Sequence, residues 1–256
     1  MIKEHWNIDN EFLEAIENSY KNYLLIHARS NKKLIPLHGY ISKKLSIILG
    51  KEYKIKSLGF DNGKESNFKG KFYDKNIDIA VFKNNIELGG IGIKFITGNY
   101  KQNGNNYFEN MLGETVNIKR VGTKYAQIII IKEKIPYFSS DKNLFTKIEN
   151  ISDNDLKKYI ILDLEKNEFA HKPDLIYINL IKTGDEKIIE NNLKIKIDRK
   201  IFNQNILFPN VKCKFSEIKL SNNFSFKTKE YLVKHSNLEN FLIAFSNYIK
   251  ANEYGK

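Results

Sequence analysis

The chain has 256 residues, of which 41% are hydrophobic and 28% charged, a length and balance typical of a globular protein with a buried core. Its single cysteine excludes a disulfide framework and a cysteine-based zinc site. The sequence contains no run of about 18 apolar residues, so no membrane span is predicted. The net charge of +12 favours a polyanion as partner, although a lysine-rich composition alone would also produce it.

The spacing of apolar residues changes along the chain from a helical period to a strand period, and then alternates between the two. The predicted elements are, in chain order, a helix capped by Asp9, a helix from Pro36 to Gly50, strands over 52–59, 66–74, 76–82 and 88–96, a helix over 105–118, a strand over 125–131, a helix over 152–165, a strand over 174–181, short strands and loops between 193 and 202, and a helix over 237–250. We therefore predict one α/β domain with a mixed central β-sheet flanked by helices.

The segment NIDIAVFKNNIELGGIGIKF, residues 76–95, is predicted to form a hairpin. A turn centred on Asn85 places Asp78 opposite Gly92, and alternation puts both on one face with Lys94. The other face is apolar and is expected in the core; its residues are Ile77, Ile79, Val81, Ile91, Ile93 and Phe95. A carboxylate on a buried sheet needs a cationic partner. Asp78 is therefore expected either to bind a metal ion or to form a structural ion pair with Lys94.

This hairpin resembles the core of the PD-(D/E)XK nuclease superfamily, to which most type II restriction endonucleases belong. The resemblance runs from the first predicted helix to the strand over 125–131, in the order αβββαβ. Asp78 matches the metal-binding acid at the end of one strand, Lys94 matches the lysine of the next, and Gly92 stands where the second acid belongs. The resemblance implies Mg²⁺ held by Asp78, by the strand carbonyl of Ile93 and by a second acid, with Lys94 orienting the attacking water.

A branch of this family takes the second acid from the helix that follows the lysine. The helix predicted over 105–118 offers Glu109 and Glu114, which lie about 140° apart around a helix, so both cannot easily reach one ion. The spacing from Lys94 favours Glu109, and Glu114 is the substitute. We predict that the acid missing at Gly92 has moved to this helix.

Other acids and the histidines are weaker candidates. The segment HKPDLIYINLIKTGDEK carries a second nominal match, Asp174 and then Asp185 with Lys187, but TGDEK is typical of a turn whose charged side chains face solvent. Glu65 is a candidate to reach the site from the neighbouring strands, whereas Glu87 lies at the edge of the hairpin loop. The histidines have no ligand spacing and are interpreted as structural; they are His5, His27, His38, His171 and His235.

Two segments are candidates for DNA contacts. The first is a basic turn between the first two helices, and the second is a loop over 97–107, directly after Lys94, whose amide side chains suit adenine edges in the major groove. The predicted DNA-binding residues are Arg29, Lys32, Lys33, Asn99, Lys101, Gln102, Asn103, Asn105, Asn106 and Arg120.

The leading hypothesis is a Mg²⁺-dependent type II restriction endonuclease that acts on double-stranded DNA as a homodimer, because two strands need two sites. Its catalytic core is expected over residues 9–135, with 136–256 completing the sheet and serving DNA binding or dimerisation. The N-terminus lacks an apolar signal segment, which favours the cytoplasm of a bacterial cell. Two alternatives stay open: a structure-specific repair or junction nuclease of the same fold, and a non-catalytic DNA-binding protein in which Gly92 marks a lost metal site.

Overall fold

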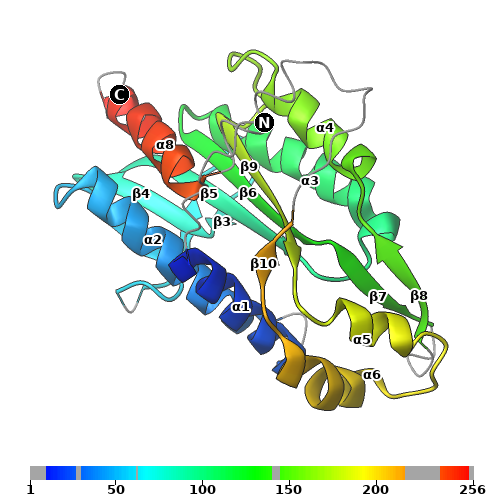
Figure 1. Cartoon of the computed structure of the whole chain (residues 1–256). Coiled ribbons are helices and arrows are strands. Elements are labelled where there is room, and N and C mark those ends of the chain that lie inside the picture. Colours follow the sequence, from blue (N-terminus) through cyan, green and yellow to red (C-terminus); the bar gives the residue numbers. More distant parts are fainter. Residues whose placement is uncertain (1–9, 27–29, 62, 140–144, 217–236, 254–256) are drawn as a thin grey trace, which may run out of the picture.

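The centre of the molecule is a six-stranded mixed sheet in the order β1–β4–β5–β6–β9–β10 (Figure 1). The computed structural model describes residues 10–26, 30–61, 63–139, 145–216 and 237–253, to which all structural statements refer. The strands of the sheet are β1 (Lys54–Ser57), β4 (Ile79–Lys83), β5 (Ile86–Ile96), β6 (Lys124–Lys132), β9 (Leu175–Lys182) and β10 (Lys214–Phe215). With helices on both faces, the structure confirms the predicted α/β fold with a mixed central sheet.

The three central strands β5, β6 and β9 run parallel, and the outer strands join them antiparallel. Parallel neighbours need long crossovers, which here contain α3 (Tyr100–Lys119) between β5 and β6, and α4 (Asp153–Asp163) between β6 and β9. The isoleucine run of β6 is buried throughout, as expected for a parallel strand that is covered on both faces.

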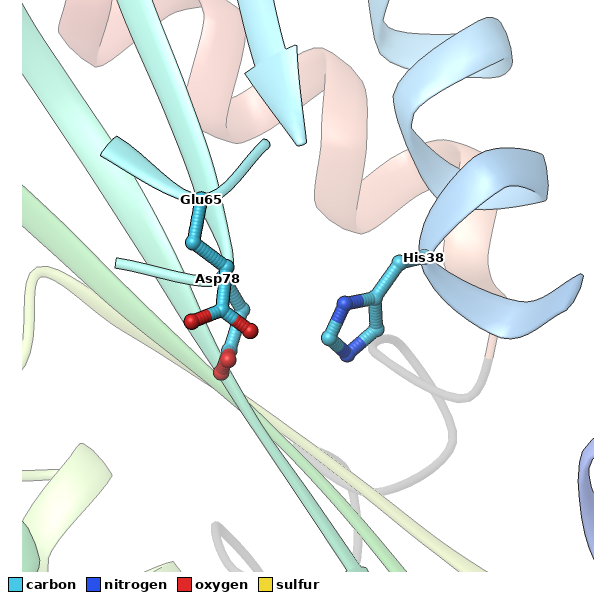
Figure 2. A group of neighbouring side chains, drawn as sticks. All are labelled: His38, Glu65 and Asp78. Atoms are coloured by element: carbon cyan, nitrogen blue, oxygen red, sulfur yellow. The ribbon is translucent and has the colours of Figure 1, made fainter. Parts of the chain in front are cut away.

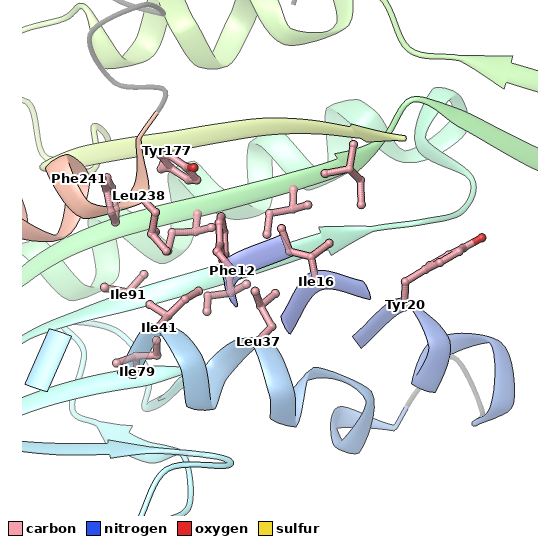
Figure 3. Close-up of a cluster of buried hydrophobic side chains, with 14 of the residues drawn as sticks. Phe12, Ile16, Tyr20, Leu37, Ile41, Ile79, Ile91, Tyr177, Leu238 and Phe241 are labelled. Carbon is pink, nitrogen blue, oxygen red and sulfur yellow. The ribbon is translucent and has the colours of Figure 1, made fainter. Parts of the chain in front are cut away.

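The two faces of the sheet bury separate apolar clusters. Ile128 and Ile130 join the cluster beneath the helices α1 (Asn10–Leu25), α2 (Ile35–Leu49) and α8 (Leu238–Glu253), and Figure 3 shows a part of this cluster. Ile129 and Ile131 join the cluster beneath α3 and α4. The first cluster extends from Phe12 to Ile249 and so unites the predicted core with the C-terminal part of the chain.

Shorter elements extend this framework. They are η1 (Asn31–Leu34), β2 (Ser66–Phe68), β3 (Lys75–Ile77), β7 (Lys134–Phe138), β8 (Phe145–Asn150), α5 (Glu186–Asn191), α6 (Arg199–Ile201), η2 (Phe202–Leu207) and η3 (Phe208–Asn210). The pairs β2–β3 and β7–β8 are separate two-stranded sheets. The strands expected between 193 and 202 are absent from the described structure, which has α6 there. Among the described helices, none combines the length and apolarity that crossing a membrane requires.

The predicted hairpin is present, with a two-residue turn at Asn84 and Asn85 in place of a turn centred on Asn85. Asn84 and Asn85 take positive φ angles of 50° and 64°, the conformation that a two-residue hairpin turn requires. A bulge beside Val81 then shifts the register so that Ile79 pairs with Ile91. Asp78, one residue before β4, therefore lies opposite Gly92.

The strand predicted over 76–82 is interrupted at Asp78, which corrects one part of the prediction. The segment before Asp78 is β3 and pairs with β2, whereas the segment after it is β4 and pairs with β1 and β5. Ile77 consequently packs with Phe68 on the α3 side of the sheet and does not share a face with Ile79. The break sets Asp78 at the junction of the two sheets.

A close backbone contact holds α2 against the loop that follows β1. A Cβ atom on Gly39 would lie 2.4 Å from the carbonyl oxygen of Gly59, a distance that no side chain tolerates. Only a glycine at position 39 permits this approach. The contact fixes the start of α2 beside the segments that lead into β2 and β4.

Candidate metal centre

Three side chains from separate segments meet at this junction. His38 comes from α2, Glu65 from the residue before β2, and Asp78 from the break between β3 and β4. One potential ligand atom of each lies within 4.8 Å of the others, and Figure 2 shows the imidazole ring facing the two carboxylates. One imidazole nitrogen and two carboxylate oxygens are a donor set that suits a divalent metal ion.

Asp78 is fixed by the backbone around it. Its Oδ2 accepts a hydrogen bond from the Ile93 N–H at 2.6 Å, and its own carbonyl accepts one from Ser57 Oγ at 2.8 Å. Burial raises the pKa of Asp78 to about 6, against the opposing effects of the Ile93 N–H and the Lys94 charge. The ionised carboxylate is therefore held in an environment that lacks a sufficient cation.

His38 is fully buried, and neither of its ring nitrogens has a hydrogen-bond partner within the described part of the chain. Burial lowers the pKa of His38 to about 4, so the ring is neutral at pH 7 and able to donate a lone pair to a metal. Buried polar atoms without partners are uncommon in native proteins, because each one costs free energy. The orphaned imidazole is the observation that best fits a bound cation.

Glu65 completes the group. Burial raises the pKa of Glu65, and the neighbouring charge of Asp78 raises it further. Asn31 Nδ2 of η1 donates a hydrogen bond to Glu65 Oε1 at 3.4 Å. Two carboxyl groups whose pKa values are both raised, beside a neutral imidazole, form a site that a divalent cation would stabilise.

Lys94 and Glu114 lie beside this group. Glu114 Oε1 is 3.4 Å from Lys94 Nζ and 2.7 Å from Lys75 Nζ, and the Glu114 side chain is only 12% exposed. No salt bridge joins Lys94 to Asp78 among the described residues, so the structural ion pair considered from sequence does not form. Lys94 acts on Asp78 only at longer range, where its charge lowers the pKa of that carboxyl.

The preference for Glu109 is corrected by the position of α3. This helix buries Met111, Thr115 and Ile118, which leaves Glu114 at the side that faces β5. Glu109 is exposed, and its charge acts on Lys158 of α4 instead. Of the two glutamates proposed from sequence, the structure brings Glu114 to the lysine.

The predicted reading loop over 97–107 is mostly helix. Asn99 precedes the first turn of α3, and the following polar residues are exposed or tie the helix to its neighbours. Their contacts join Lys101 to Asp155, Gln102 to Tyr137, Asn103 to the Asn99 carbonyl, and Asn105 to Lys158, while Asn106 is exposed. Arg120 lies at the opposite end of α3. Of the basic turn, Lys32 and Lys33 lie in η1, and Arg29 lies outside the described residues.

A surface of cations and aromatic rings, not foreseen from sequence, adjoins η1. Here it is called the cation–aromatic surface, and it comprises Tyr23, Lys33, Tyr137, Lys147 and Arg199, with the buried ring of Phe138 beneath Arg199. Arg199 Nη2 lies 3.1 Å from Tyr23 Oη, and its guanidinium is 5.5 Å from the Phe138 ring centre. Arg199 and Lys147 form no salt bridge with any described residue, so both charges are available to an anion. Gly98, four residues after Lys94, lies against Tyr23 and Arg199.

The second nominal match to the nuclease pattern is structural, but one expectation about it is wrong. Asp185 of TGDEK does not face solvent: it is fully buried, and Lys132 Nζ approaches its carboxylate oxygens at 2.8 and 2.9 Å. Asp174 accepts a hydrogen bond from the Tyr125 N–H and pairs with Lys119. Each of these two acids therefore forms an ion pair with a lysine, whereas Asp78 forms none with a described residue.

Comparisons of the chain with protein family models, with curated proteins and with solved structures found no match.

Proposed function

We propose that this chain is a metal-dependent nuclease that hydrolyses phosphodiester bonds in double-stranded DNA, in the manner of a type II restriction endonuclease. The observation that carries the proposal is the convergence of His38, Glu65 and Asp78 on one small volume, with the imidazole left without a partner among the described residues. The hairpin resemblance supports the same reading, because Asp78 and Lys94 take the places of the acid and the lysine.

Each side chain has a role in this proposal. His38, Glu65 and Asp78 would hold the ion, and the Ile93 N–H fixes the Asp78 carboxylate in position. A bound divalent ion supplies a Lewis acid that polarises the phosphate and lowers the pKa of a water. Lys94 would donate a hydrogen bond to the attacking water or to a phosphate oxygen, and Glu114 holds its ammonium group in place.

The ligand set also bears on the choice of metal. The family resemblance implies Mg²⁺, which prefers an all-oxygen environment. The imidazole of His38 adds a nitrogen donor, which suits transition metals such as Mn²⁺ better than Mg²⁺. We therefore propose that Mg²⁺ and Mn²⁺ both support cleavage and that Mn²⁺ binds more tightly.

DNA is the proposed substrate because of the charge of the chain and its distribution. The net charge of +12 favours binding to phosphates, and the cation–aromatic surface lies next to η1, whose Asn31 contacts Glu65. A homodimer remains the proposed active form, because cutting both strands requires two such sites.

The test is cleavage of phage-length double-stranded DNA by the purified chain, with Mg²⁺, with Mn²⁺ and with EDTA. Asp78→Asn and Lys94→Met remove the proposed ligand and the proposed lysine. Asp163→Asn is the matched control, because Asp163 is also a buried aspartate that accepts a strand N–H, from Ile176 at 3.0 Å, and burial raises its pKa to about 7.

Discrete fragments that require metal, persist in Asp163→Asn and vanish in the two site variants would support the proposal. A smear, or cleavage confined to branched DNA, would replace it with a structure-specific nuclease of the same fold. A salt-sensitive mobility shift without cleavage under any metal would replace it with a DNA-binding protein.

A further inference from the structure

The space beside Gly92, where the family pattern has an acidic side chain, is filled by two other polar side chains. Gly92 of β5 pairs with Gln127 of the parallel strand β6, so the two positions share a face of the sheet. A Cβ atom on Gly92 would lie 2.5 Å from Tyr125 Oη and 2.6 Å from Gln127 Nε2. A side chain at position 92 would therefore require the Tyr125 hydroxyl and the Gln127 amide to shift from these positions. The glycine makes room for a polar pair that a neighbouring strand supplies.

Only one of the two polar atoms of the Gln127 side chain has a hydrogen-bond partner among the described residues. Gln127 is fully buried, and its Nε2 donates to Tyr125 Oη at 2.8 Å. Its Oε1, by contrast, has no hydrogen-bond partner within the described part of the chain. A buried amide oxygen without a donor is costly, as is the orphaned imidazole of His38. Gln127 pairs with Gly92, and Gly92 lies opposite Asp78, so Gln127 occupies the position two strands away from Asp78 on the sheet.

The acids of the site are close to the pair. Burial raises the pKa of Tyr125 well above its ordinary value, and the charges of Glu114 and Asp78 raise it further. The Tyr125 hydroxyl, and with it the Gln127 amide, therefore lies in the electrostatic field of these two carboxylates. A neutral oxygen acceptor in that position can accept a hydrogen bond from a water of a hydrated metal ion without adding a third negative charge.

We propose that Gln127 replaces the second acid of the hairpin, as a positioning residue whose Oε1 faces the hydrated metal ion held by Asp78. This inference rests on the proposed metal site and adds to it the source of the acceptor that Gly92 cannot provide. Tyr125 holds the amide in place by accepting its N–H group. The site is accordingly less negative than one with an acid at position 92, and its affinity for a divalent ion is correspondingly moderate.

The experiment is calorimetric titration of Mn²⁺ into the metal-free, full-length chain. Gln127→Glu puts a carboxylate in the place of the amide with the same shape, and Gln127→Asn withdraws the oxygen by one methylene group. Asn179→Asp is the matched control, because Asn179 Nδ2 donates to Tyr177 Oη at 2.5 Å in the same amide–tyrosine arrangement on β9. Tyr177 belongs to the cluster beneath α1, α2 and α8, so this control pair lies on the opposite face of the sheet.

We expect Gln127→Glu to bind Mn²⁺ about tenfold more tightly than the unaltered chain, Gln127→Asn about tenfold more weakly, and Asn179→Asp equally well. Circular dichroism in EDTA checks folding, and if the buried glutamate prevents folding, Gln127→Asn decides alone. Affinities of the Gln127 variants equal to that of the unaltered chain would overturn this inference and leave the metal site standing. Absence of Mn²⁺ binding by the unaltered chain would overturn both the proposed function and this inference.

Discussion

Replacement of Asp78 by asparagine should stabilise the metal-free protein while it abolishes metal binding. Asn keeps an oxygen that accepts the Ile93 N–H, but it removes the charge that burial disfavours. The rise of the Asp78 pKa from 3.8 to about 6 corresponds to about 3 kcal/mol of lost stability in the ionised state. With neighbouring groups free to relax, we expect Asp78→Asn to gain roughly 1–3 kcal/mol at about pH 8 in EDTA.

Because the pKa of Asp78 is raised in the folded state, the folding stability should fall as the pH rises. The folded state holds its Asp78 proton up to about pH 6, whereas the unfolded chain releases it near 3.8, so the folded state binds more protons in this interval and stability falls as the pH rises. The advantage of Asp78→Asn should therefore be small at pH 4, grow towards pH 7 and then remain constant. Urea denaturation at several pH values in EDTA measures this difference.

Adding Mn²⁺ distinguishes loss of a metal ligand from a change in stability that is unrelated to metal binding. At a concentration about 100 times its dissociation constant, a ligand stabilises the folded state by about 2.7 kcal/mol, and only proteins with an intact site should gain it. Asp163→Asn should also gain stability in EDTA, because burial raises the pKa of Asp163 to about 7, but it should keep the full response to Mn²⁺. Equal stabilisation of Asp78→Asn and the unaltered chain by Mn²⁺ would refute the assignment of Asp78 as a ligand.

Three further predictions test the neighbours of Asp78. His38→Leu should raise the melting temperature in EDTA, because it removes two buried nitrogens without partners among the described residues, at about 1–3 kcal/mol, and it should abolish the preference for Mn²⁺ over Mg²⁺; a metal preference that survives would exclude the imidazole as a ligand. Glu114→Gln should lower the cleavage rate at least tenfold by releasing the site lysine, whereas Glu109→Gln should cleave normally, and equal rates for the two would contradict the role of Glu114. Arg199→Ala should weaken DNA binding in EDTA and reduce the salt slope by about 1, with Lys166→Ala, which removes an exposed charge outside the cation–aromatic surface, as the control; an anisotropy titration of Arg199→Ala identical to that of Lys166→Ala would exclude this surface from DNA binding.

The sequence predicts well those features that depend on local pattern. The isoleucine run of β6 forms the buried strand that its composition predicts, and the two asparagines form the hairpin turn. The pairing of Asp78 with Gly92 is as predicted but depends on the bulge beside Val81, because the two-residue turn alone would place Asp78 opposite Ile91. The sequence does not predict the start of α3, because the asparagines and glycine there have low helix propensity and are held in the helix by contacts with α4 and β7.

The positions of the proposed ligands other than Asp78 depend on long-range contacts that leave little trace in the sequence. His38 occupies an otherwise ordinary apolar face of α2, and only the approach of Gly39 to Gly59 brings it to the acids. Glu65 reaches Asp78 because the strand breaks at that residue and pairs with β2 before the break. The one available signal was a histidine on the buried face of a helix without an evident partner, and such residues are more often structural.

The salt bridge that Lys94 forms determines whether the Asp78 carboxylate has a neutralising cation within the protein. A salt bridge between Lys94 and Asp78 would neutralise the carboxylate and lower its pKa, as ion pairing does for buried acids. In the structure Lys94 and Lys75 instead form salt bridges with Glu114, and burial raises the pKa of Asp78 to about 6. In the metal-free protein the cost of the buried charge is met by protonation of Asp78 below about pH 6. Under the proposed function a divalent ion bound by Asp78, Glu65 and the neutral His38 ring would supply the positive charge instead.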